Sequence, residues 1–225
     1  MILDPDNKYI RAINTYAPLA GTTILEIGCG SGRMTGDLAE HAEHVVATDI
    51  DSSALEQAQR QISAKNVDFL LSDDGFPRLK KGVFDLVIYT LSLHHVPINK
   101  MAANLEHTGQ LLKKSGKIVV VEPGNGGSFL EVKKRFGAGS GDEDAEKAAA
   151  KRAMKNLTGW ILSPTHSFAV DFLFSNAADF YASKLPTYRK LPVEEQAALA
   201  EFLSRHTTDR GIILTSERYL NLLSR

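Results

Sequence analysis

An acidic residue followed by alternate glycines gives this sequence its clearest chemical signal. The segment Glu26-Ile27-Gly28-Cys29-Gly30-Ser31-Gly32 places an acid at the end of an apolar, β-rich run and then a glycine at every second position. Glycine lets the backbone turn sharply and lets a ligand approach the main chain closely. A helix expected to begin near Arg33 would present unpaired N–H groups to the same place. The segment therefore predicts a ligand-binding loop.

Two further acids follow the next two apolar runs. Asp49 stands about 20 residues after Gly28, the spacing at which an acid of nucleotide-binding folds accepts the ribose hydroxyls. Asp73 ends the following run, where its carboxylate could meet the exocyclic amine of adenine. Parallel strands end at one sheet edge, and open α/β sheets bind ligands in the crevice there. An amino-acid head, a ribose and an adenine in that order describe S-adenosylmethionine.

The glycine spacing does not fit a dinucleotide. The dinucleotide pattern G-x-G-x-x-G needs a third glycine for close packing of helix and strand. Counted from Gly28 and Gly30 that position holds Arg33, and counted from Gly30 and Gly32 it holds Thr35. An NAD-dependent oxidoreductase is therefore an alternative from topology alone. A non-catalytic module that binds S-adenosylmethionine is a second alternative.

The elements that must position these residues alternate between two periodicities. Short apolar runs suit strands covered on both faces, and the stretches between them carry one apolar stripe at helical spacing. Ser53 and Glu56 form a capping-box pattern at the start of one such helix. The pattern predicts right-handed βαβ crossovers and a doubly wound, mostly parallel α/β sheet. The first five expected strands are 23–27, 44–48, 67–71, 84–89 and 116–121.

The chain changes character after residue 123. Glycine-rich stretches at 124–127 and 137–141 flank a short basic segment, which predicts a mobile connection. We expect one domain over 1–225, with a cofactor-binding core at 22–123, a helical insertion at 124–165 and C-terminal strands and helices at 166–225 that shape the acceptor pocket. The later elements are expected at 142–157 (helix), 166–174 (strand), 175–184 (helix capped by Ser175), 192–205 (helix) and 211–223 (last strand).

Composition limits the classes of partner. The 225 residues include 26 Lys and Arg against 27 Asp and Glu, a net charge of −1, which offers no footprint for nucleic acid. The single cysteine, Cys29, cannot form an internal disulfide and fits a reducing compartment. No run approaches the roughly 18 apolar residues of a membrane span, and no secretory signal is recognised. We expect a cytoplasmic protein with no membrane partner, and the sequence leaves its oligomeric state open.

Taken together, the motifs resemble the class I S-adenosylmethionine-dependent methyltransferases. The resemblance is narrower to the small-molecule type often called methyltransferase type 11, and it runs from about Ile24 to Pro123. It implies a Rossmann-like methyltransferase fold of seven strands with an antiparallel last strand. The matching segments are 26–32, 48–51, 67–73, 84–87, 91–96 and 111–117.

The resemblance also implies a role for each site residue, with S-adenosylmethionine as the cofactor. Glu26 and the backbone of Gly28, Cys29 and Gly30 would hold the methionine part. Asp49 would hold the ribose, and Ile50 would cover one adenine face. Asp73 would take the adenine amine with Asp74 beside the ring. The segment from Thr90 to His95 would border the sulfonium and the acceptor.

His94 and His95 are the candidate catalytic residues. Either could be a general base for a hydroxyl or acidic-carbon acceptor, and the alternative is a hydrogen bond that shapes the loop. Adjacent histidines are not at metal-ligand spacing, so no metal is predicted. The balanced charge and apolar later segments favour a small, partly apolar metabolite as acceptor, whose identity stays open.

Overall fold

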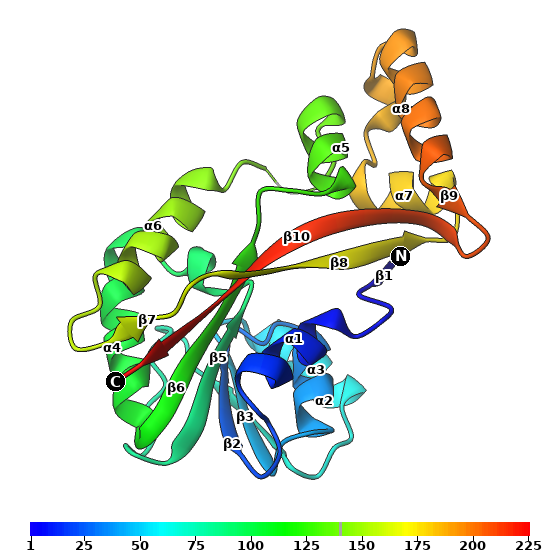
Figure 1. Cartoon of the computed structure of the whole chain (residues 1–225). Coiled ribbons are helices and arrows are strands. Elements are labelled where there is room, and N and C mark those ends of the chain that lie inside the picture. The colour runs from blue at the N-terminus through cyan, green and yellow to red at the C-terminus, as the bar shows by residue number, and fades with distance from the viewer. Residues whose placement is uncertain (140) are drawn as a thin grey trace. The chain divides into compact units, whose positions relative to one another are not determined.

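The computed structural model describes residues 1–139 and 141–225, and its strands join one mixed sheet (Figure 1). The strand order is β1-β8-β10-β6-β5-β2-β3-β4, and two short strands, β7 and β9, pair with β10. The chain divides into two compact units. Unit 1 comprises Met1–Tyr9, Pro123–Asp142 and Ser167–Arg218, and unit 2 comprises Ile10–Glu122, Glu143–His166 and Tyr219–Arg225.

Unit 2 is built on parallel strands. β2 lies between β3 and β5, β3 also pairs with β4, and β5 also pairs with β6, all in parallel. The elements from α1 to the end of the unit are α1 (Lys8–Tyr16), β2 (Thr23–Ile27), α2 (Arg33–Ala39), β3 (His44–Asp49), α3 (Ser52–Gln61), β4 (Val67–Leu71), β5 (Phe84–Thr90), the 3-10 helices η1 (Leu93–His95) and η2 (Ile98–Lys100), α4 (Met101–Leu111), β6 (Leu112–Pro123), α6 (Asp144–Lys155) and β7 (Ile161–Leu162).

Unit 1 gathers the remaining elements. They are β1 (Ile2–Leu3), α5 (Ser128–Phe136), β8 (His166–Phe174), α7 (Ala177–Lys184), the 3-10 helix η3 (Tyr188–Lys190), α8 (Val193–Arg205), β9 (Thr207–Thr208) and β10 (Gly211–Ser224), whose last residues belong to unit 2. β10 pairs antiparallel with both β7 and β9. The seven longer strands are those expected from the sequence, which confirms the doubly wound α/β fold. The three two-residue strands β1, β7 and β9 are too short to show a period and were not predicted.

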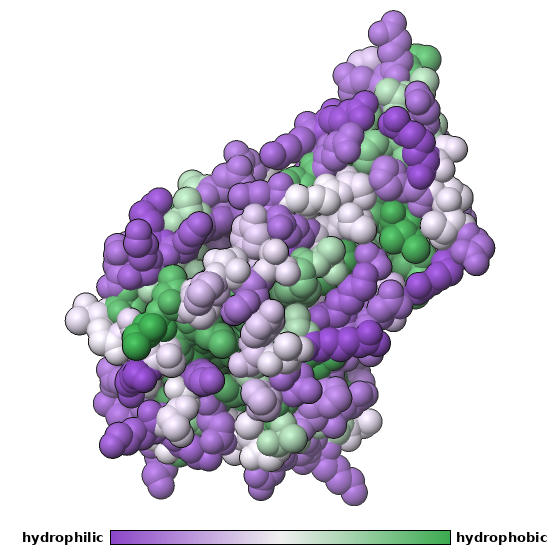
Figure 2. Space-filling view, in the orientation of Figure 1, coloured by the Kyte–Doolittle hydropathy of each residue, from purple (hydrophilic) through white to green (hydrophobic). Residues whose placement is uncertain are grey.

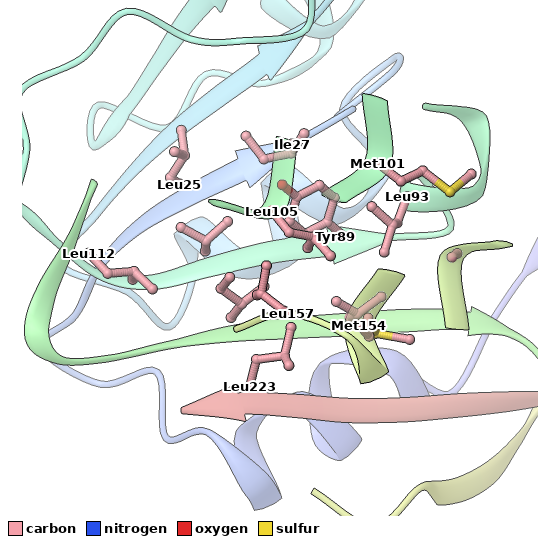
Figure 3. Close-up of a cluster of buried hydrophobic side chains, with 14 of the residues drawn as sticks. Leu25, Ile27, Tyr89, Leu93, Met101, Leu105, Leu112, Met154, Leu157 and Leu223 are labelled. Atoms are coloured by element: carbon pink, nitrogen blue, oxygen red, sulfur yellow. The ribbon is translucent and has the colours of Figure 1, made fainter. Parts of the chain in front are cut away.

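The main core of unit 2 lies between the sheet and its helices (Figure 3). Leu25 of β2, Leu105 of α4 and Met154 of α6 are buried in one cluster. Tyr89 is also buried there, and its hydroxyl hydrogen-bonds Asn104 Oδ1 at 2.7 Å. This polar contact lets a phenol lie in an apolar core because the buried hydroxyl of Tyr89 is paired.

Three local predictions were wrong. The stretch 124–141 contains helix α5 rather than only a connection, with Val132 and Phe136 buried on one face. Helix α3 is capped by the Asp51 side chain, which accepts the N–H of Ser53, so Ser53 is not the cap. Helix α7 begins at Ala177 after the Asn176 cap, and Ser175 is not the cap. In both helices an Asx side chain supplies the acceptor that was assigned to a serine.

The visible surface is mainly polar, as expected for a chain with nearly equal numbers of basic and acidic residues. On the face shown in Figure 2 polar side chains dominate, and apolar side chains appear in separate patches between them. Within the described residues, no helix combines the length and apolar character needed to cross a bilayer.

Candidate cofactor-binding and active site

The carboxyl ends of β2, β3 and β4 meet at one edge of the sheet. The register pairs Ile27 with Thr48 and Asp49 with Leu71, so the residues that follow these strands are neighbours. A cavity of about 420 Å³ opens at this edge. Seven of the predicted site residues line it: Gly28, Gly30, Asp49, Ile50, Asp73, Asp74 and His95. The other four, Glu26, Cys29, Thr90 and His94, are not among its lining residues.

The loop glycines serve two purposes. All three have left-handed φ values, 73° at Gly28, 55° at Gly30 and 87° at Gly32. A Cβ on Gly28 would lie 2.6 Å from the Cβ of Ser92, so this glycine is needed for packing. A Cβ on Gly30 would meet no atom within 4 Å, although Gly30 lines the cavity. The loop therefore leaves open space where a ligand can approach the backbone.

Asp49 ties the glycine loop to the end of β3. Its Oδ2 accepts the N–H of Gly30 at 2.6 Å, and its Oδ1 accepts the N–H of Asp51 at 3.0 Å. The N–H of Gly28 donates to the Thr48 carbonyl at 2.8 Å. Because a carboxylate has about four lone-pair sites, Asp49 can hold the loop and still accept hydroxyls from a ligand.

Glu26 lies buried behind the loop. Thr35 Oγ1 of α2 donates to Glu26 Oε2 at 2.6 Å. Burial raises the pKa of Glu26 to about 7, and the Thr35 hydrogen bond and the Arg33 charge oppose this rise. Sequence reasoning used Thr35 only to exclude a dinucleotide and missed this contact. Its signal was a small hydroxyl residue on the inner face of the helix that follows the loop.

Cys29 and Thr90 do not line the cavity themselves. The whole Cys29 residue is buried, whereas in Thr90 the side-chain oxygen is buried. Cys29 donates its backbone N–H to the Thr48 carbonyl at 3.0 Å, and burial raises the pKa of its thiol. Because Cys29 does not line the cavity, the role of its backbone toward a ligand stays a prediction. Thr90 Oγ1 is buried without a hydrogen-bond partner among the described residues, and Ser72 Oγ, on the cavity wall, is the second such oxygen. Buried polar atoms without partners commonly mark a missing ligand or water.

The adenine end of the predicted site contains two acids, of which one has partners in the described chain and the other has none. Asp73 is exposed on the cavity wall, and in the described part of the chain its carboxylate has no hydrogen-bond or ion-pair partner. Asp74 accepts the N–H of Phe76 at 2.9 Å and pairs with Arg78 at 2.7 Å. The Phe76 N–H is the main cause that holds the pKa of Asp74 below its usual range. Ile50 offers a 64% exposed apolar side chain beside them.

The segment after β5 supplies lining residues that sequence reasoning did not single out individually. Leu91 has φ of 56°, an uncommon conformation for a residue with a side chain, and its N–H donates to the Val121 carbonyl at 2.8 Å. Ser92 Oγ donates to the Ile27 carbonyl, which ties this segment to the end of β2. Strained residues of this kind cluster at functional sites.

The two histidines have different surroundings. His94 is buried, and both its backbone N–H and its ring Nδ1 contact the carboxylate of Glu122 at the end of β6. His95 lies on the cavity wall, where partial burial of its ring, together with the neighbouring His94, lowers its pKa. Ligand-type atoms of His94, His95 and Glu143 lie within 4.8 Å of one another, and Lys147 Nζ lies 3.6 Å from the Glu143 carboxylate. Glu122 was missed because only the fold brings it to His94.

Residues 24–116 match the model of a family described as a methyltransferase domain. This segment is a methyltransferase domain. Its motifs and doubly wound sheet are those of the class I S-adenosylmethionine-dependent methyltransferases, which confirms the resemblance seen in the sequence.

Relatives of the methyltransferase domain carry the same general description. An uncharacterized methyltransferase of Mycobacterium tuberculosis (strain ATCC 25618 / H37Rv) is 30% identical over 113 residues, 50% of this chain and 56% of the relative. A ubiquinone biosynthesis O-methyltransferase of Thiobacillus denitrificans is 35% identical over 91 residues, 39% of each chain. The chain thus spans about half the length, or less, of these curated relatives.

Solved structures support the fold of the methyltransferase domain and of the segments around it. An S-adenosylmethionine-dependent methyltransferase from Aquifex aeolicus aligns with a TM-score of 0.57 at 15% identity, over 69% of this chain and 80% of that one. Another from Mesorhizobium loti aligns with a TM-score of 0.51 at 16% identity, over 94% and 95%. At such low identity the likeness concerns the fold.

Proposed function

We propose that this chain is an S-adenosylmethionine-dependent methyltransferase that transfers a methyl group to a small-molecule acceptor. One observation carries the proposal: within a methyltransferase domain, a single cavity joins the open glycine loop, Asp49 and Asp73 at the sheet edge. These are the three parts that an adenosyl amino acid requires, and they follow three consecutive strands, β2, β3 and β4.

The residues present fit this cofactor. Gly30 leaves open space beside its backbone, Asp73 has a carboxylate with no partner in the described chain, and Ile50 presents an exposed apolar surface. Ser72 Oγ is buried on the wall without a hydrogen bond. A ligand with hydroxyls, an amine and an apolar ring would satisfy these groups, because unpaired buried polar atoms cost free energy.

Each contact can be assigned to a part of the cofactor. We assign the ribose hydroxyls to Asp49, one adenine face to Ile50 and the adenine amine to Asp73, with Asp74 holding the turn beside the ring. The backbone from Gly28 through Cys29 to Gly30 would face the methionine part. Glu26, which does not line the cavity, would act from behind this loop, where a nearby ammonium group would favour its charged form, and Thr90 would border the reacting end.

The protein's contribution to catalysis is mainly positioning. When bound, S-adenosylmethionine supplies an activated methyl group on a sulfonium. Holding the acceptor in line with such a group can by itself contribute roughly 7–11 kcal/mol. Exclusion of water prevents a competing reaction. For a hydroxyl or acidic-carbon acceptor, His94 or His95 would accept the proton that the acceptor loses.

Three observations favour a small acceptor. Two relatives are named after small molecules: ubiquinone biosynthesis O-methyltransferase and phosphoethanolamine N-methyltransferase 1. The formal charge of −1 gives no general attraction to nucleic acid. The cavity wall is largely apolar, with Ile27, Leu91 and Val96 among its residues. A cytoplasmic location stays a prediction from the lone cysteine.

Calorimetry and a product search test the proposal. The purified chain should bind S-adenosylmethionine and not NADH, and Asp73→Asn should weaken binding because the amine loses a charged acceptor. Incubation with cell extract and methyl-labelled cofactor should then give labelled small molecules. Label confined to tRNA or protein would overturn the acceptor class. Binding with no labelled product would favour a non-catalytic module, and NADH binding alone would favour an oxidoreductase.

A further inference from the structure

Glu122 and His94 form a buried pair next to the cavity. Glu122 is 7% exposed and His94 is 3% exposed. One carboxylate oxygen accepts the backbone N–H of His94 at 3.2 Å, and the other contacts Nδ1 of the same residue. In the described part of the chain, the polar contacts of the Glu122 side chain are both with His94. A buried carboxylate is costly to keep unless hydrogen bonds satisfy it, so these two contacts fix Glu122 and His94 to each other.

The pair fixes the short helix η1 from one side. On the other side, Ser92 Oγ is tied to the Ile27 carbonyl, and the His95 N–H donates to the Ser92 carbonyl at 3.1 Å. Ser92 and His94 of this turn are therefore anchored to strands β2 and β6. His95 follows these two anchors directly, so its backbone position is restricted, as precise positioning of a reacting group requires.

The two histidines of this turn are not equivalent. Nδ1 of His94 is occupied by Glu122, and His94 is not among the residues that line the cavity. His95 lines the cavity, and its ring centroid lies 4.1 Å from that of His94. We propose that His95 is the residue that receives the acceptor's proton, and that Glu122 is a positioning residue that acts on it through His94. This inference rests on the proposed methyltransferase function.

The step is a simple proton transfer. One proton passes from a hydroxyl or acidic carbon of the acceptor to a neutral ring nitrogen of His95, which becomes an imidazolium. The electron pair stays on the acceptor atom that takes the methyl group. Among the described residues, the ionisable groups that act on His95 include His94 on η1, Glu122 on β6 and Glu143 before α6. Lys100 lines the same cavity, and Lys147 Nζ lies 3.6 Å from the Glu143 carboxylate. The two glutamates are placed to stabilise the imidazolium once it forms.

Nitrogen NMR of histidine-labelled protein tests the link from Glu122 to His95 without an acceptor. Glu122→Gln should shift the ring resonances of both His94 and His95 at one neutral pH, because the carboxylate that orients His94 is gone. A matched control is the exposed His44–Asp68 pair of the same unit, at 3.0 Å. Asp68→Asn should shift only His44. An unchanged His95 resonance in Glu122→Gln would overturn the positioning role.

A folding defect can be separated from this effect. If the Glu122→Gln spectrum has lost its dispersion, His94→Gln replaces it, because this variant removes the same link and leaves the carboxylate. His95 should shift in His94→Gln as well. A tight one-to-one Zn²⁺ complex that is lost in His95→Gln would assign the cluster with Glu143 to a metal and overturn the proton-transfer role.

Turnover in extract with labelled cofactor tests the chemical role of His95. His95→Gln should lower label transfer by about 100-fold, while the dissociation constant of S-adenosylmethionine stays within about twofold. Glu122→Gln should lower transfer by a smaller factor, again with cofactor binding retained. A larger loss in His94→Gln than in His95→Gln would reverse the assignment. If the wild-type chain binds no S-adenosylmethionine, the proposed function fails, whereas the NMR result still decides the positioning role.

Discussion

Both units contain buried polar groups with hydrogen-bond partners, but the buried side-chain oxygens without a partner in the described chain lie in unit 2. In unit 1, buried Arg218 donates to Ser216 Oγ at 2.6 Å and also to Tyr9 Oη, while Asp4 accepts two backbone N–H groups. In unit 2, two buried side-chain oxygens, Ser72 Oγ and Thr90 Oγ1, have no partner among the described residues. Satisfied polar groups stabilise a fold, and unsatisfied ones mark where a ligand belongs.

Both units expose some apolar side chains, for example Val193 in unit 1, but the exposed side chain of Ile50 lies on the cavity wall. Unit 1 stacks Phe129 on Phe172 with ring centroids 4.3 Å apart, and Lys184 lies 5.5 Å from the Phe172 ring. Unit 2 leaves Ile50 64% exposed on the cavity wall. We infer that unit 2 supplies the cofactor site and that the described polar groups of unit 1 mainly maintain its own structure.

The largest expected effect is on cofactor binding by Asp49→Ala. The ribose hydroxyls and the Gly30 N–H would each lose a charged acceptor, which should weaken S-adenosylmethionine by about 2–4 kcal/mol. The matched variant in unit 1 is Asp171→Ala, which removes a carboxylate paired with Lys8 at 2.7 Å. It should leave the affinity unchanged in the same calorimetric titration. Equal losses in the two variants would end the assignment of the cofactor to unit 2.

The same contrast explains what the sequence could predict. Strands of a parallel sheet read as near-continuous apolar runs, so β2 to β6 were located, and acids at their ends marked Asp49 and Asp73. Glu122 was missed because its importance depends on a contact with His94, 28 residues earlier in the chain. Sequence spacing along one strand gives no sign of such a pair.

Unit 1 was harder to predict. Its helix α5 begins after Gly127 and ends before Gly137, two glycines with positive φ that look like a flexible segment in the sequence. Only two of its residues, Val132 and Phe136, are buried, which is too short an apolar stripe to identify a helix. Leu91 was missed for a different reason, since leucine gives no warning of a left-handed conformation.

The next effect concerns stability and pH. The pKa of Glu26 is about 7 in the folded chain against an ordinary 4.5, chiefly because of burial. Between these values the folded state keeps a proton that the unfolded state has lost, so the free energy of unfolding falls as pH rises, by roughly 3 kcal/mol. Glu26→Gln should remove this fall. Urea unfolding at several pH values measures it, and parallel curves for the two proteins would contradict the burial argument.

In unit 1, an acid should make the free energy of unfolding rise, not fall, as pH increases. Hydrogen bonds from the chain's amino group and from the Ser175 N–H hold the pKa of Asp179 below its usual range. Its contribution is therefore present above the unfolded pKa and is lost as pH falls. Asp179→Asn should flatten the acid side of the stability curve and leave the range near neutrality, where Glu26 titrates, as it is.

A smaller effect is expected from alanine at two open glycines. Gly30 of unit 2 and Gly137 of unit 1 both have positive φ, and a Cβ on either would meet no atom within 4 Å. Each substitution should therefore cost about 1–2 kcal/mol of stability through backbone strain alone. Only Gly30→Ala should also weaken S-adenosylmethionine, because only Gly30 lines the cavity. Equal cofactor affinity in the two variants would mean that the ligand does not approach the loop backbone.

The smallest expected effect is the loss of stability on removing one helix cap, and it tests whether the two units unfold together. Asp51→Ala removes the cap of α3 in unit 2, and Asn176→Ala removes the cap of α7 in unit 1. Each should cost about 1 kcal/mol. Strand β10 contributes residues to both units without a break, so we expect one cooperative transition. Either variant should then lower the same melting temperature by roughly 2–4 °C in a calorimetric scan. Two separate transitions, each moved by only one variant, would show that the units are independent in stability as well as different in chemistry.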